Sequence, residues 1–73
     1  MYILKVLQNG DSHSYEFDTE DKAVLAFYGK VVETRMRNYD FVVMDLRYKG
    51  KELINFVFDK NTNRVQDLRP TCL

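Results

Sequence analysis

The residue best suited to acid–base chemistry in this chain is His13, its single histidine. Asp11, Ser12 and Glu16 lie close to it in the sequence, and a histidine beside such groups could act as a general base or activate a nucleophile. No motif places a partner for the ring, and the segment alternates as a β-strand does. We therefore interpret His13 as a half-buried strand residue whose ring tip reaches solvent, and we expect no catalytic residue and no enzyme.

The run 59–63 reads D-x-N-x-N, the spacing that opens a calcium-binding EF-hand loop. Such a loop then needs glycine at its sixth position and a bidentate glutamate at its twelfth, where this chain has Arg64 and Pro70. An Asx-rich turn between strands accounts for the same residues. The single cysteine, Cys72, and the single histidine cannot supply the four ligands of a structural zinc site. We expect neither a metal site nor a cofactor.

Basic residues with neighbouring tyrosines could hold a single nucleic-acid strand by phosphate contacts and stacking. Eleven acidic and eleven basic residues cancel, so no global field favours nucleic acid, and the aromatic RNA-binding signature is missing. Nucleic-acid binding is therefore the alternative function. Its candidate contacts are Lys30, Arg35, Arg37, Arg47, Lys49, Lys51, Tyr39 and Tyr48.

The elements that position these side chains begin with a hairpin closed by Asn9 and Gly10. Asn-Gly accepts the positive φ that both central positions of a type I′ turn require. A two-residue turn pairs Gln8 with Asp11 and gives the hairpin one largely apolar face and one mixed face. On the apolar face Val6 lies opposite His13, Leu4 opposite Tyr15 and Tyr2 opposite Phe17. Turn chemistry and alternation thus indicate the same register.

A helix is expected next, from about Thr19 to about Arg37. Asp18 or Thr19 can serve as its N-cap and Asn38 as a left-handed C-cap. Its apolar residues recur at three- and four-residue spacing, which predicts one buried stripe. The members of this stripe are Ala23, Val24, Phe27, Tyr28 and Val31.

A second hairpin is expected over 41–48 and 53–58, around Lys49-Gly50-Lys51. A two-residue turn would put the apolar sets of these two strands on opposite faces. We therefore predict a loop longer by one residue, with Gly50 in a bulge. After it, Val65 and Leu68 form either a short fifth strand or part of a tail.

These elements predict one α+β domain, residues 1–73, of ββαββ type. A four-stranded antiparallel sheet carries one helix on one face, with room for a short fifth strand near the C-terminus and a loose tail at 69–73. The order of the strands is not readable from the sequence. A domain this short buries only about 60% of the surface of its unfolded chain, which favours association with another chain.

More apolar residues are present than one helix and one sheet face can bury. We expect the surplus to form a contact surface, either on the outer face of the sheet or on a helix shoulder beside the buried stripe. A broad core stripe on the helix, with the C-terminal tail folded over the sheet, is the alternative. Gly29 lies within the expected helix, where glycine costs about 1 kcal/mol relative to alanine. A glycine at this position would allow the backbone of another element to approach the helix closely. The sheet candidates are Ile3, Leu7, Val43, Leu53 and Val57, with Phe41 beside them, and the helix candidates are Leu25, Gly29, Val32 and Met36.

The sequence therefore predicts a small non-enzymatic module that binds another protein, as a homodimer. Its size and layout resemble many small bacterial and bacteriophage proteins of ββαββ type, some of which bind and block a host enzyme, including inhibitors of bacterial defence systems. The resemblance implies an inhibitor or adaptor that acts on a partner enzyme. A lone cysteine, no export signal and no apolar span predict a cytoplasmic protein without a membrane segment.

Overall fold

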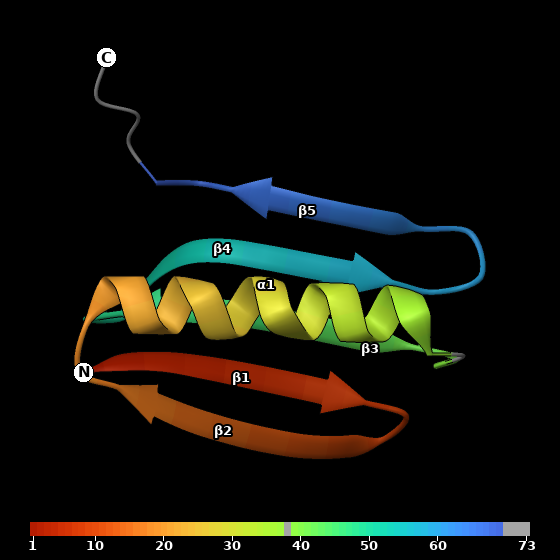
Figure 1. Ribbon diagram of the computed structural model, residues 1–73, viewed down its shortest axis with the longest axis horizontal. Helices are drawn as coiled ribbons and strands as arrows, with labels where there is room; N and C mark the ends of the chain where they lie inside the picture. The colour runs from red at the N-terminus through yellow and green to blue at the C-terminus, as the bar shows by residue number, and fades with distance from the viewer. Residues whose placement is uncertain (38, 70–73) are drawn as a thin grey trace.

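The computed structural model describes residues 1–37 and 39–69. One helix packs against a five-stranded antiparallel sheet whose strand order is β2-β1-β3-β4-β5, so the fold is α+β as predicted (Figure 1). The elements are β1 (Tyr2–Gln8), β2 (Asp11–Phe17), α1 (Glu20–Met36), β3 (Val42–Tyr48), β4 (Lys51–Phe58) and β5 (Asn63–Asp67). No helix of the described part of the chain is long and apolar enough to cross a membrane.

The first hairpin has the predicted register. Gln8 pairs with Asp11, and both residues of the turn have positive φ, 49° at Asn9 and 90° at Gly10. His13 pairs with Val6 as expected, but its side chain is exposed, not half-buried. The reason is the position of β2 at the edge of the sheet, beyond the part of the sheet that α1 covers (Figure 1).

Helix α1 begins and ends within a residue of its expected bounds. The hydroxyl of Thr19, the N-cap, accepts a hydrogen bond from the backbone N–H of Lys22 (3.3 Å). Two acidic residues occupy the first turn, where the helix dipole favours negative charge. Arg37 is the C-cap residue; the left-handed cap predicted at Asn38 lies outside the described residues.

The second hairpin corrects one prediction. Its turn has two residues, Lys49 and Gly50, both with positive φ (53° and 77°), and not the longer loop. The extra residue lies inside β4 instead: Leu46 pairs with Ile54, while Arg47 pairs with Glu52. The bulge at position 53 still places the apolar sets of both strands on one face, which was the reason for predicting a longer loop.

A fifth strand is present, and it completes the sheet. β5 pairs antiparallel with β4, and the N–H of Leu68 donates to the carbonyl of Leu53 (2.8 Å) just beyond its end. Arg69, predicted to begin a loose tail, donates from its guanidinium to the carboxylate of Asp67. The rest of that tail, 70–73 with Cys72, lies outside the described residues.

The core lies between α1 and the sheet face that it covers. Strands β1 and β3 pair at the centre of the sheet, which puts Leu4 opposite Leu46 and Val6 opposite Met44 beneath the helix. All members of the core are at most 2% exposed. They are Leu4, Val6, Ala23, Phe27, Val31, Val42, Met44, Leu46, Ile54 and Phe56.

Candidate functional site

The most exposed large apolar side chains of the helix lie on its outer side. Leu25 is 77% exposed, Val32 54% and Met36 81%. At 3.6 residues per turn, these positions and Gly29 fall on the side of α1 opposite the buried residues, which are Ala23, Phe27, Val31 and Thr34. We call Leu25, Gly29, Val32 and Met36 the outer helix stripe. The sequence placed them on a shoulder beside the buried stripe; they instead point away from the sheet.

Gly29 leaves the middle of the outer helix stripe open. A Cβ built at this position would have no heavy atom within 4 Å outside its own helix turn and chain neighbours. The backbone of α1 is therefore accessible between Leu25 on one side and Val32 and Met36 on the other. Another backbone can approach the helix at this point more closely than a side chain would allow.

The outer face of the sheet carries a polar row that the sequence did not reveal. Lys5 pairs with Ser14 on one side and Asp45 on the other, Asp45 pairs with Asn55, and Asn55 pairs with Gln66. Each strand thus contributes one polar side chain to the same row. Asn55 donates to the side-chain oxygen of Gln66 (3.3 Å), and one oxygen of Asp45 is buried without a hydrogen-bond partner.

This row divides the predicted sheet surface. Leu7 pairs with Val43 and Val43 with Val57, so these three are neighbours on one side of the row. Ile3, which pairs with Arg47, lies on the other side. Leu53 is the bulge residue and packs against the core. The predicted sheet patch is therefore reduced to three adjacent side chains, each partly exposed. Phe41 precedes β3 and is 38% exposed.

The predicted nucleic-acid contacts do not form one surface. Arg47, Lys49 and Lys51 lie around the β3–β4 turn, while Arg35 and Arg37 lie at the far end of α1 (Figure 1). The two predicted tyrosine contacts also lie in different places. Tyr39 packs against the core, and Tyr48 stacks on Tyr2 with ring centroids 4.2 Å apart.

Several of the same basic side chains are engaged within the fold. Lys30 and Arg37 both pair with the carboxylate of Glu33, at 3.4 and 3.7 Å. The guanidinium of Arg47 pairs with Asp45 at 3.1 Å. Arg35 donates to the side-chain oxygen of Asn63 (3.1 Å) and lies over the ring of Phe56. A polyanion would therefore compete with contacts that these side chains already make.

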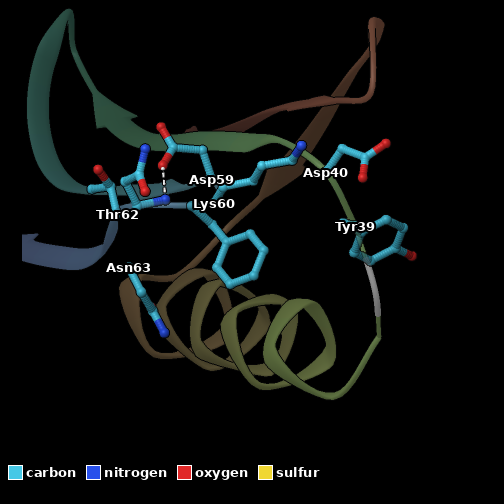
Figure 2. A pocket seen from close by; sticks show the side chains of 8 residues that line it. Tyr39, Asp40, Asp59, Lys60, Thr62 and Asn63 are labelled. Carbon is cyan, nitrogen blue, oxygen red and sulfur yellow. Dashed lines mark hydrogen bonds between the residues drawn. The ribbon is translucent and has the colours of Figure 1, made fainter.

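A hollow of about 430 Å³ lies where the segment before β3 meets the turn after β4 (Figure 2). The carboxylate of Asp59 accepts a hydrogen bond from the N–H of Asn61 (2.8 Å), and the N–H of Asp59 donates to the carbonyl of Thr62 (2.8 Å). The D-x-N-x-N run thus forms an Asx turn, as predicted from its sequence. Within residues 1–37 and 39–69, no group of three or more His, Cys, Asp and Glu side chains could hold a metal ion.

The pKa shifts of the described residues arise from neighbouring charged groups and from partial burial. A hydrogen bond from Lys22 lowers the pKa of Asp18, and a hydrogen bond from Arg69 lowers the pKa of Asp67. Partial burial, with Glu20 nearby, raises the pKa of Tyr2. Asp18 and Asp67 each pair with a neighbouring cation, and the ring of Tyr2 stacks on that of Tyr48.

Sequence reasoning missed one surface, the free edge of β2. All of its residues except Phe17 are exposed. An apolar hollow of about 190 Å³ lies beside it, between the helix and the strand. Its lining is Leu4, Tyr15, Phe17, Ala26 and Lys30. The sequence could not identify β2 as an edge strand, because its place at the edge depends on the order of the strands in the sheet.

The fold and these surfaces define a small α+β domain with a helix that is apolar on two opposite sides. No family model, curated protein or solved structure matches the chain.

Proposed function

We propose that this chain is a non-enzymatic protein-binding module that works as a homodimer, and that the outer helix stripe contacts the partner protein. The observation that carries the proposal is the exposure of Leu25, Val32 and Met36 on the side of α1 that faces away from the core. Single exposed apolar residues are ordinary. Three large ones in line along one helix face, on a chain this small, are typical of a contact surface.

The spacing of the residues in the outer helix stripe indicates the kind of surface that the partner presents. Residues at i, i+4, i+7 and i+11 are the anchors with which a helix lies in an apolar groove or against another helix. Gly29 lets the partner's backbone come close at the centre of the contact. We therefore expect the partner to present an apolar groove or helix face. The resemblance in size and layout to small bacterial and bacteriophage inhibitors supports the narrower proposal that the partner is an enzyme and that binding blocks it.

The experiment is an affinity pull-down from a lysate of the organism that encodes the chain, with and without nuclease. A protein retained by the unmodified chain after nuclease treatment should be lost with Leu25→Glu and with Met36→Glu. Both side chains are more than three-quarters exposed, so neither change should affect folding.

Two controls make the result specific. Asn61→Glu adds the same charge in the exposed β4–β5 turn and should retain the partner. Val43→Glu with Val57→Glu tests the remaining apolar residues of the sheet face. Loss of the partner in this double variant, with retention by Leu25→Glu, would contradict the assignment to the helix. Recovery of nucleic acid alone would contradict the function itself.

A further inference from the structure

Strand β2 forms one edge of the sheet, and no described element covers it (Figure 1). An edge strand presents unpaired N–H and C=O groups that can template another strand. Proteins commonly blunt such edges with charged side chains, especially lysine, or with proline, a bulge or a short strand. β2 carries Asp11 and Glu16 toward its two ends but no lysine, proline or bulge, and its seven residues, DSHSYEF, pair with β1 without a register shift. The opposite edge, β5, has five residues and includes Arg64.

The turn determines which backbone groups of β2 are free. Gln8 and Asp11 flank a two-residue turn, so they exchange hydrogen bonds, and bonded and non-bonded pairs alternate from there. The N–H and C=O groups of Ser12, Ser14 and Glu16 therefore point away from β1, toward solvent. The unoccupied edge thus offers three evenly spaced pairs of donors and acceptors.

We propose that a second copy of the chain occupies this edge, through an antiparallel β2–β2 pair that joins the two sheets into one. The proposal deepens the homodimer of the proposed function and assigns its interface to a surface other than the outer helix stripe. Free backbone groups must face free backbone groups. The register that pairs all seven residues sets Ser14 opposite Ser14 of the second copy and Ser12 opposite its Glu16.

This register keeps the acidic side chains of the two copies from facing each other directly. The carboxylate of Glu16 meets the hydroxyl of Ser12, and Asp11 meets Phe17, so neither acidic residue faces its own counterpart. On the helix side, His13 lies opposite Tyr15 of the second copy, an aromatic cross-strand pair of the kind that stabilises antiparallel sheets. Tyr15 is 41% exposed in the single chain, and the pairing would cover part of it.

The pairing also keeps the two helices on the same face of the joined sheet. Residues with equal side-chain direction face each other, so the inner face of one copy continues into the inner face of the other. Both outer helix stripes then remain exposed. The dimer would present two equal contact surfaces to a partner, which raises its avidity if both are engaged.

The first test is the mass in solution by light scattering at tens of micromolar. We expect twice the 8.7 kDa of one chain. Ser14→Pro removes an outward-pointing N–H, a position where edge strands tolerate proline. It should leave the fold intact by circular dichroism and raise the dimer dissociation constant by about tenfold or more, since two hydrogen bonds are lost per dimer. Val32→Glu should leave the mass unchanged.

A monomer mass for the unmodified chain would overturn the proposal. So would a dimer that survives Ser14→Pro and dissociates with Val32→Glu, because its interface would then be the helix. Neither result depends on the pull-down, so failure of the dimer and failure of partner binding are separate outcomes.

A cysteine series tests the register even where the proline variant does not fold. In a Cys72→Ser background, Ser14→Cys should form a covalent dimer under mild oxidation, because facing residues of a hydrogen-bonded pair have Cα atoms about 5.5 Å apart, within disulfide range. Glu16→Cys alone should not, since position 16 faces position 12. Mixing Glu16→Cys with Ser12→Cys should restore the crosslink. Equal crosslinking of Glu16→Cys and Ser14→Cys would overturn the register.

Discussion

Asn9 and Phe41 are joined by two reciprocal hydrogen bonds. The N–H of Asn9 donates to the carbonyl of Phe41 (3.0 Å), and the N–H of Phe41 donates to the side-chain oxygen of Asn9 (3.1 Å). The tip of the first hairpin is thereby fixed to the start of β3. Since β1 and β3 are the strands through which the two hairpins pair, this clip lies at the point where the first hairpin joins the second.

Replacement of Asn9 should separate its two roles. Asn9→Gly keeps the positive φ but removes the side-chain acceptor, and should lower the free energy of unfolding by about 0.5–1.5 kcal/mol. Asn9→Ala also places a side chain in the left-handed region, which adds about 1 kcal/mol. Urea unfolding of both variants measures the difference. Asn9→Asp retains an acceptor and is the control; equal stability of Asn9→Gly and the unmodified chain would show that the clip contributes nothing.

Gly10→Val should destabilise the domain through the backbone alone. Gly10 has a φ of 90°, and beyond its chain neighbours no heavy atom lies within 4 Å of the position that a Cβ would occupy. A β-branched residue in this region costs about 1–3 kcal/mol, through crowding of its side chain against the local backbone and not against the rest of the fold. The melting temperature should fall accordingly, while Gly10→Asn, which tolerates positive φ, should fall less. A melting temperature unchanged by valine would contradict the type I′ turn.

The Asp67–Arg69 pair should make the end of β5 sensitive to acid. Hydrogen bonds from Arg69 lower the pKa of Asp67, so the pair stabilises the fold above the unfolded pKa of about 4 and loses this effect as pH falls through the lower folded pKa. Because both side chains are about one-third exposed, the effect should be about 0.2–1 kcal/mol. The difference in melting temperature between the unmodified chain and Asp67→Asn should be constant near neutral pH and vanish in strong acid. A difference that grows toward acid would have the wrong sign for this pair.

Local chemistry made the first hairpin and the helix predictable. Asn9-Gly10 determines a register that alternation confirms, and Thr19 with the acidic first turn marks the start of α1. The prediction for the second turn was wrong for two reasons. A lysine such as Lys49 does not indicate a positive φ, and a bulge can lie several residues away from the turn. The bulge at Leu53 places the apolar residues of β3 and β4 on the same face of the sheet, as a longer loop would also do.

The candidate surfaces depended on information that one sequence does not hold. The polar row on the outer sheet face forms only because the strand order brings Lys5, Asp45 and Asn55 into line. In the helix, Tyr28 was assigned to the buried stripe, yet it is 37% exposed, while Thr34 is 2% exposed. Burial of threonine is tolerable because its hydroxyl donates to the carbonyl of Lys30 (2.8 Å).

The buried side of α1 includes Thr34 and not Tyr28, so it is rotated about the helix axis relative to the predicted stripe. Because of this rotation, the surplus apolar residues of the helix lie opposite the buried side and not on a shoulder beside it. Residues on a shoulder lie beside the sheet, whereas Leu25, Val32 and Met36 point away from it and are 54% to 81% exposed.

Gly29→Ala should increase stability and weaken partner binding at the same time. The position is an exposed helix interior with open space around it, so alanine should stabilise the domain by about 0.5–1 kcal/mol through helix propensity. The added methyl group stands in the middle of the outer helix stripe, where we expect the partner's backbone to approach. Retention of the partner in the pull-down should therefore drop in a protein that melts at a higher temperature, a combination that loss of folding cannot produce. Leu25→Met, which keeps an apolar side chain of similar volume, is the matched control and should retain the partner. If Gly29→Ala retained the partner as fully as this control, Gly29 would lie outside the contact, and the partner would engage the ends of the stripe without approaching the helix backbone.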